Sequence, residues 1–310
     1  MPKIRVMLLK LECFQYATSL DPNMGYYHMR LSKEESNVCT IILTWLKYKC
    51  KRLPVGVCNS LDIFQDKINK MFREIELIRA YIGELLVITK FYWSDPLDKL
   101  ELVIKKLRAK RLGCNIENSY FGQTKMKYLG FRVTRTGIRP INKKIEAIVN
   151  MTPSKNQKQV RSFIGLVNYY RDMWDKQLHL LQPLTAFKPN KVKCKWTVVE
   201  QKSFNEIIEI VARDTLLIHP DFNKRFHIHT DASKFHSGAV ISQDGVPITF
   251  YSHKLTGTQT WYTVTEKELL SIVKTLKEFC TILLGQQLKI YTYHKILTCK
   301  TFNTGTSLDT

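Results

Sequence analysis

The sequence predicts an α+β protein of two or three domains. At 310 residues the chain is longer than one ordinary domain, and its 44% hydrophobic residues are enough for proper cores. Its character also changes twice: residues 1–138 alternate short apolar runs with turns, residues 139–222 are helical in periodicity, and residues 223–310 return to strands around one helix. We therefore expect a mixed first domain, a helical middle region and a final sheet covered by a helix.

The first domain carries two strand signals and one helix signal. The apolar run Ile75–Thr89 is broken by Gly83-Glu84, which predicts two strands joined by a tight type II′ hairpin. A helix is expected from about Pro96 to Arg111, because Pro suits its first turn and Gly113 follows its end. Tyr128–Val133 predicts one further strand. The apolar face of the helix would hold Leu97, Leu100, Ile104 and Leu107.

The rest of the chain predicts helices and then a sheet. Apolar residues at helical spacing indicate two helices, one through Val160, Phe163, Ile164 and Val167 and one through Phe204, Ile207, Ile208 and Val211. Thr197 and Glu200 form a capping box for the second helix. The final part reads β-β-β-α-β, with strands at Phe226–Thr230, Gly238–Ser242, Ile248–Ser252 and Leu288–Tyr293 and a helix at Glu266–Leu284.

The charge balance is the first indication of function. The chain has 48 Lys and Arg residues against 27 Asp and Glu residues, a net charge of +21, and such an excess favours polyanions through counterion release. Ribosomal, chromatin and membrane-surface proteins share this composition, so charge alone does not identify the partner. Eight cysteines without a C-x-x-C pair argue against a zinc ribbon and suit a reducing compartment. No stretch approaches the roughly 18 apolar residues of a membrane span. We expect an intracellular protein, cytoplasmic or nuclear, with no membrane partner.

Ordered motifs along the chain resemble one family. TSLDPNMGYYHMRL (18–31), RLPVGVCNSLDIFQ (52–65) and KYLGFRVTRTGI (127–138) resemble the palm of gypsy-class LTR retrotransposon reverse transcriptases. HTDASKFHSGAVISQDGVPITFYSHKL (229–255), TEKELLSIVKTLKEF (265–279) and IYTYHKIL (290–297) resemble the RNase H part of the same Pol polyproteins. The resemblance implies a palm at 1–138, a helical thumb and connection region at 139–222 and an RNase H-like domain at 223–310. It also implies a fingers segment before the palm and further residues after the last motif, so we expect a truncated copy.

The polymerase site of the family holds Mg²⁺ with three aspartates, one at a strand end and two in a Tyr-x-Asp-Asp hairpin. The resemblance assigns the first to Asp21, which taken alone would be an ordinary turn former. The hairpin here is Tyr81-Ile82-Gly83-Glu84. Gly83 has no carboxylate and Glu84 is one methylene longer than Asp, whereas Mg²⁺ demands near-octahedral ligation. We expect this hairpin to be structural only.

Two further positions match the nucleotide-binding residues of the family. Tyr26 matches the aromatic residue beneath the incoming sugar, and Gln65 matches a residue beside the nucleotide. A core aromatic residue and an exposed Gln would look the same in the sequence. Asn118 stands where the family has Lys.

The RNase H site of the family is also built from carboxylates and two metal ions. The resemblance assigns Asp231 after the first strand and Glu268 in the first turn of the helix. Glu268 has an equally good structural interpretation, because Thr265-x-x-Glu268 reads as a capping box. The third ligand belongs in a Thr-Asp-His motif, where this chain has Thr292-Tyr293-His294. The fourth is expected beyond residue 310. The remaining metal ligands would be Asp21, Asp231 and Glu268.

Three hypotheses remain open at this point. The chain is an active RNA-directed DNA polymerase with RNase H activity, or a catalytically inactive copy that still binds RNA–DNA hybrid or duplex, or the product of a decayed reading frame without function. The lost carboxylates at Gly83 and Tyr293 favour the second. Its candidate binding surface comprises the basic stretches Lys105–Arg111, Lys125–Arg135 and Lys188–Lys195.

Overall fold

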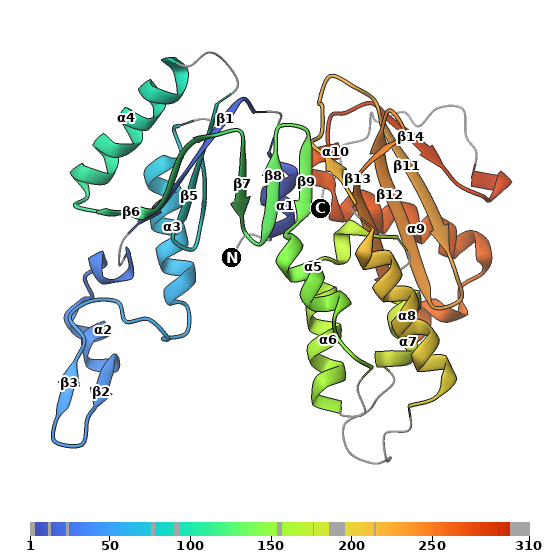
Figure 1. Cartoon of the computed structure of the whole chain (residues 1–310), viewed down its shortest axis with the longest axis horizontal. Coiled ribbons are helices and arrows are strands. Elements are labelled where there is room, and N and C mark those ends of the chain that lie inside the picture. Colours follow the sequence, from blue (N-terminus) through green and yellow to red (C-terminus); the bar gives the residue numbers. More distant parts are fainter. Residues whose placement is uncertain are drawn as a thin grey trace. The chain divides into compact units, whose positions relative to one another are not determined.

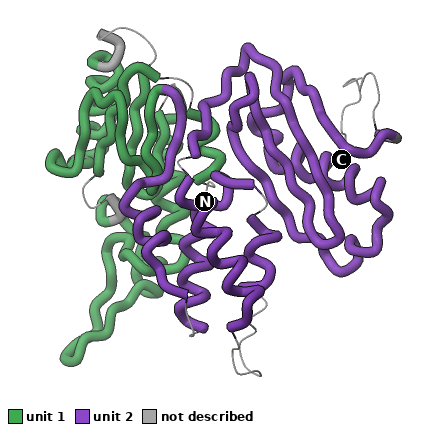
Figure 2. Tube along the Cα trace, turned by 45° about the vertical axis from the view of Figure 1, so that its right-hand side comes forward, with its two compact units in different colours: residues 1–135 green, residues 136–310 purple. Residues whose placement is uncertain are grey.

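The computed structural model divides the chain into two compact units, Met1–Arg135 and Thr136–Thr310 (Figure 2). It describes residues 4–11, 14–22, 25–75, 78–89, 94–153, 157–175, 177–185, 196–213 and 215–297. The division falls close to the predicted end of the palm. The predicted boundary at residue 222 lies inside the second unit and stays a prediction. Within the described residues, no helix is both long and apolar enough to cross a membrane.

The first unit is built around a four-stranded sheet of order β4-β5-β1-β6 (Figure 1). Its strands are β1 (Tyr16–Pro22), β4 (Ile78–Tyr81), β5 (Glu84–Thr89) and β6 (Cys114–Gln123). Helix α3 (Ser60–Phe72) packs against β4, and α4 (Ser94–Ala109) packs against β5. The core between them contains Leu20, Phe64, Ile68, Phe72, Leu85, Val87, Val103 and Leu107. The helix predicted from Pro96 is confirmed, but its buried face is centred on Val103 and Leu107 while Leu97 is exposed.

Shorter elements complete the first unit. They are α1 (Ile4–Leu9), η1 (Gly25–His28), α2 (Lys33–Val38), β2 (Thr40–Ile42), β3 (Lys47–Lys49), β7 (Lys125–Tyr128) and β8 (Phe131–Thr134). The single strand predicted at Tyr128–Val133 is wrong, because Leu129 and Gly130 both have positive φ angles and form a two-residue turn between β7 and β8. Positive φ at both loop positions is the requirement of a type I′ hairpin.

The β4–β5 hairpin also differs from the expected turn. Tyr81 pairs with Glu84, so the loop residues are Ile82 and Gly83 rather than Gly83 and Glu84. Both have positive φ, 38° at Ile82 and 87° at Gly83, which makes the turn type I′ instead of the predicted type II′. Glu84 is therefore the first residue of β5 and not a turn residue.

The second unit begins with helices. They are α5 (Asn142–Val149), α6 (Gln157–Tyr169), η2 (Arg171–Met173), α7 (Gln177–Thr185) and α8 (Val198–Ala212), and two short strands, β9 (Gly137–Pro140) and β10 (Leu217–Ile218), pair beside them. The predicted periodicity is confirmed, since Val160, Phe163 and Val167 of α6 are buried. The predicted capping box of α8 at Thr197 and Glu200 is also present.

A second sheet, of order β13-β12-β11-β14, ends the described chain. Its strands are β11 (Phe226–Ala232), β12 (His236–Gln243), β13 (Val246–Lys254) and β14 (Leu288–Tyr291), with η3 (Thr258–Trp261), α9 (Val264–Glu278), α10 (Cys280–Leu283) and η4 (Lys295–Leu297). The first three strands are antiparallel, and β14 joins β11 in parallel. The predicted β-β-β-α-β order is confirmed, except that the helix is interrupted at Phe279.

The start of α9 corrects one expectation. The capping box is formed by Thr263 and Glu266: the Thr263 side chain accepts the Glu266 N–H, and the Glu266 carboxylate accepts the Thr263 N–H. The box predicted at Thr265 and Glu268 is wrong by two residues. Glu268 therefore lies one residue past the first turn and is free to serve another purpose.

Candidate functional site

The first carboxylate pair, Asp21 and Glu84, forms at the ends of two neighbouring strands. β1 and β5 are antiparallel with Leu20 opposite Leu85, so continuing that register by one residue sets Asp21 opposite Glu84. Partial desolvation raises the pKa of Glu84, the Leu129 backbone N–H lowers it as a hydrogen-bond donor, and the nearby Asp21 carboxylate raises it further. The two carboxylates thus lie near enough to influence each other electrostatically, despite more than sixty residues of separation along the chain.

Asp21 of this pair already makes hydrogen bonds to other groups of the first unit. The Asn118 side-chain amide donates to Asp21 Oδ2 (3.1 Å), and the Asp21 backbone N–H donates to Ser119 Oγ (3.2 Å). The register of β1 against β6 shifts between Ser19 and Asp21, and such an irregularity redirects a side chain at a strand end. Gly83, beside the pair, offers no ligand.

Gln65 anchors the hairpin that carries Glu84. Its side chain is buried, donating to the Ala80 carbonyl (2.7 Å) and to Asn69 Oδ1 (2.8 Å) and accepting the Ile82 N–H (2.9 Å). Both hairpin groups lie on the backbone at the turn, so Gln65 ties α3 to β4. The surface-exposed Gln considered from the sequence is wrong, and a contact with nucleotide stays a prediction. Tyr26 lies in η1, but its side chain is outside the described residues.

The second carboxylate pair, Asp231 and Glu268, lies in the second unit. Asp231 belongs to β11 and is exposed, whereas Glu268 of α9 is 4% exposed. Burial raises the pKa of Glu268, and the Asp231 carboxylate adds to this, while hydrogen bonds from the Thr292 hydroxyl and the Ala232 backbone N–H lower it. The Thr292 Oγ1 lies 3.3 Å from Glu268 Oε2. This pair is therefore a buried carboxyl beside a solvated one.

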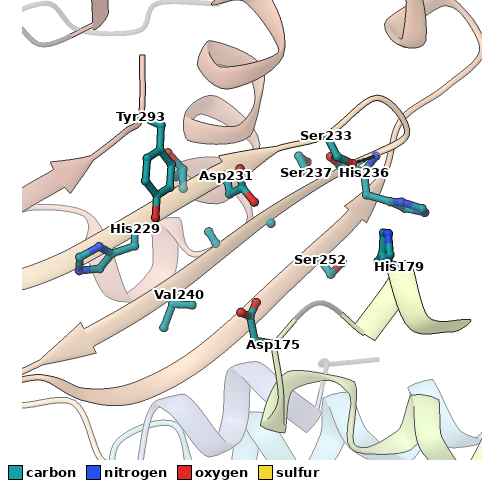
Figure 3. A pocket seen from close by; sticks show the side chains of 13 residues that line it. Asp175, His179, His229, Asp231, Ser233, His236, Ser237, Val240, Ser252 and Tyr293 are labelled. Carbon is teal, nitrogen blue, oxygen red and sulfur yellow. Dashed lines mark hydrogen bonds between the residues drawn. The ribbon is translucent and has the colours of Figure 1, made fainter. Parts of the chain in front are cut away.

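Tyr293, at the position where the resemblance predicts the third ligand, lies at the same cavity as Asp231. Its side chain is 89% exposed, and with Asp231 it lines a cavity of about 440 Å³ above the sheet (Figure 3). His179 and His236 line the same cavity, and the pKa of His236 is lowered by burial and then by His179 and Lys254. Thr265, wrongly assigned to the cap, bonds instead to His294 Nε2 (3.1 Å).

A polar stripe on α9 holds the second pair in place and was missed in the sequence. Glu268, Ser271 and Thr275 are all buried and face the sheet. The Ser271 hydroxyl lies 3.1 Å from the Gly238 carbonyl and 3.4 Å from the Asp231 carbonyl. Three short polar side chains spaced at i, i+3 and i+7 on the sheet side of an amphipathic helix are the signal that could have revealed it.

Neither pair fits the metal site that the family requires. The resemblance predicts at least three carboxylates in each site, and each pair supplies two. Asn118 donates a hydrogen bond to Asp21 in the first pair, and Thr292 donates one to Glu268 in the second. Among the parts of the chain that the structure describes, no group of three or more His, Cys, Asp or Glu residues could hold a metal ion.

Comparison with known proteins agrees with the fold and the motifs. Residues 196–290 match the family described as "RNase H-like domain found in reverse transcriptase". The Pol polyproteins of the Drosophila melanogaster transposons opus and gypsy are 32% and 29% identical, each over 96% of this chain. Its homologues are retrovirus-related Pol polyproteins of transposons. This chain spans about a third of their length, 31% of the opus polyprotein and 30% of the gypsy polyprotein.

Solved structures show the same fold. A foamy viral protease-reverse transcriptase in complex with RNA/DNA hybrid superposes with a TM-score of 0.83 at 23% identity, over 93% of this chain and 40% of that one. A second structure of that protein, in complex with double-stranded DNA, gives a TM-score of 0.81 at 23% identity, over 94% of this chain and 52% of that one. The predicted α+β fold is thereby confirmed, and the family description matched by residues 196–290 agrees with the predicted RNase H-like domain.

Proposed function

We propose that this reverse transcriptase–RNase H-like segment binds RNA–DNA hybrid or duplex nucleic acid and does not catalyse polymerisation or cleavage. One observation carries the proposal. In each unit two of the carboxylates that the resemblance predicts converge, while a further predicted ligand position holds Gly83 in one unit and Tyr293 in the other. Losing a metal ligand outright costs several powers of ten in rate, whereas affinity for phosphates is shared among many basic residues.

Charge distribution supports binding by both units. Half of the basic residues lie in each unit, so the positive charge is distributed over both units. Lys125 and Lys127 of β7 are exposed and alternate with buried Met126 and Tyr128, which leaves two cations on one face of a rigid hairpin. The stretch 105–111 is a weaker candidate, because Lys105 pairs with Glu101 and Lys106 with Glu74. The stretch 188–195 lies outside the described residues.

Salt-dependent binding to an RNA–DNA hybrid tests the proposal. Log affinity should fall with log salt at about −0.9 per phosphate neutralised, with slight sequence preference and little response to Mg²⁺. The double variant Lys125→Ala/Lys127→Ala should flatten that slope by about 1.8, two phosphates' worth. The control Lys70→Ala/Lys202→Ala removes the same charge from two exposed residues that pair with Asp66 and Glu206 on their own helices, and it should change the slope less. Folded protein without measurable binding at about 50 mM salt, where such contacts are strong, would favour the decayed reading frame.

Catalysis is tested separately. The unmodified chain should show no Mg²⁺-dependent primer extension or hybrid cleavage above the level of an Asp21→Asn/Asp231→Asn variant. If the unmodified chain is active and the double variant is not, the alternative function, a residually active polymerase, is supported. The convergence of Asp21 and Glu84 is the observation that favours this alternative. We also propose that this chain acts in an intracellular setting, cytoplasmic or nuclear.

A further inference from the structure

Two cysteines face each other at the base of the β2–β3 hairpin in the first unit. Thr40 pairs with Lys49 and Ile41 with Tyr48, so the same register sets Cys39 opposite Cys50, one step below the ladder. The Cys50 N–H donates to the Cys39 carbonyl at 2.8 Å, which extends the ladder to this pair. Both thiols are free and half-buried.

The geometry of such a pair suits a disulfide. Residues directly opposite each other in an antiparallel ladder have Cα atoms about 4.5–5.5 Å apart and side chains on the same face. Disulfides span Cα separations of about 4.4–6.8 Å, most often near 5.5–6 Å. The Cα separation expected from the register therefore lies within the range that a disulfide spans.

The β2–β3 hairpin, which begins next to this cysteine pair, has few stabilising contacts. Within the described residues, β2 and β3 form a two-stranded sheet of their own, and an isolated two-stranded hairpin is marginal in water. Its side chains are largely solvated: Ile42 is 72%, Trp45 70% and Leu46 60% exposed. A covalent link at the base would restrict the open forms of this segment.

We propose that Cys39 and Cys50 are a redox pair that closes to an intrachain disulfide and opens again on reduction. The oxidant is a small-molecule disulfide such as oxidised glutathione. The thiolate of one cysteine attacks a glutathione sulfur, forming a mixed disulfide and releasing one glutathione thiolate. The second cysteine, after losing its proton, attacks the protein sulfur of that mixed disulfide, so the Cys39–Cys50 bond forms and the second glutathione leaves. The cysteine pair loses two electrons and two protons, and the oxidised glutathione becomes two glutathione molecules.

Peptide mapping of the whole chain tests this proposal directly. The protein is treated with oxidised glutathione, its remaining thiols are alkylated, and it is digested with trypsin without reduction. Because Lys47 and Lys49 lie between the two cysteines, cleavage there separates them unless a disulfide holds the pieces together. The expected product is a Cys39 peptide joined to a Cys50 peptide, lighter by two hydrogens than the two reduced peptides together and separated by dithiothreitol.

Variants and denaturation keep the test specific. Cys39→Ser should abolish the linked peptide, and Cys58→Ser, at an exposed cysteine of the same unit, should leave its yield unchanged. In urea, Cys39 should distribute among several partners, because the preference comes from the folded ladder. Alkylation or glutathionylation of Cys39 and Cys50 without a link between them, or the same mixture of partners in folded and unfolded protein, would overturn the proposal. The outcome is independent of nucleic-acid binding.

Discussion

The carboxylate pairs of the two units are both held by a buried polar side chain on a helix, and they differ in the residue that stands where the resemblance predicts a further ligand. In the first unit, Gln65 reaches from α3 to the backbone of the hairpin beside Glu84. In the second unit, Ser271 reaches from α9 to the backbone beside Asp231. A buried polar side chain on a helix thus fixes each site through main-chain groups, and neither device depends on a metal ligand.

The substitutions themselves fall in contrasting places. Gly83 occupies a turn position with φ of 87°, where a residue without Cβ is favoured. Tyr293 lies just beyond β14 with its side chain in solvent. Gly83 suits the positive φ of its turn, whereas Tyr293 makes no demand on the local backbone. Both positions can therefore hold a residue without a carboxylate while the fold persists.

The largest effect is expected at the anchor of the first pair. Gln65→Ala removes three hydrogen bonds and leaves the Ala80 carbonyl and the Ile82 N–H without this partner. It should lower the free energy of unfolding by about 2–4 kcal/mol, the cost of leaving buried polar groups unpaired. Urea denaturation followed by circular dichroism measures it, with Gln123→Ala at an exposed site of the same unit as the control. If both variants unfold alike, Gln65 is not an anchor, and its role beside a nucleotide becomes the better explanation.

The second prediction uses the difference in burial between Glu268 and Glu84. Burial raises the pKa of Glu268 above its unfolded value, so the folded state binds the proton more tightly. The stabilisation from that proton is complete below the ordinary Glu pKa and is lost as pH rises through the raised value. Glu268→Gln, a neutral mimic, should therefore be more stable than the wild type at neutral pH, by about 1.4 kcal/mol for each unit of the raised pKa.

Thermal unfolding from about pH 4, close to the ordinary Glu pKa, to about pH 8 checks this expectation. The advantage of Glu268→Gln should shrink as the pH falls. Glu84→Gln should show the same sign with a smaller effect, because Glu84 is exposed. An advantage of Glu268→Gln that stays constant with pH would mean that the carboxyl does not titrate differently in the folded state.

Placing Asp at the two positions where the resemblance predicts a carboxylate should destabilise the fold at position 83 and leave it nearly unchanged at position 293. Gly83→Asp puts a side chain at positive φ, and since a Cβ there meets nothing within 4 Å, the cost is conformational, about 1 kcal/mol. Tyr293→Asp changes an exposed residue and should stay within about 0.5 kcal/mol of the wild type. Differential scanning calorimetry resolves the two variants. Equal losses would contradict the contrast between a turn position and a solvent-facing one.

The sequence predicted which segments are helices and strands better than it predicted turns and tertiary contacts. Helical spacing placed α6 and α8. The β12–β13 turn has positive φ at Asp244 and Gly245, and Asp-Gly is a usual type I′ pair. Ile82 and Leu129 also adopt positive φ, but bulky residues rarely do so, and both turns were therefore misassigned. The motifs identified Asp21, Asp231 and Glu268, whereas the Gln65 anchor depends on a pairing between α3 and β4 that no local pattern reports.

The smallest effect distinguishes the true cap of α9 from the predicted one. Thr263 caps the helix with Glu266, so Thr263→Ala should cost about 0.5–1 kcal/mol, the usual value for a lost N-cap. Thr265→Ala leaves the cap intact and removes a bond to His294 on a half-buried surface, and it should cost less. Amide hydrogen exchange in the first turn of α9 separates the variants, because only Thr263→Ala releases the Glu266 N–H from its acceptor. Faster exchange at the Glu268 N–H in Thr265→Ala, with exchange at Glu266 unchanged, would instead support the cap predicted from the sequence. Glu268 would then have to be explained as part of that cap and not as the buried half of a carboxylate pair.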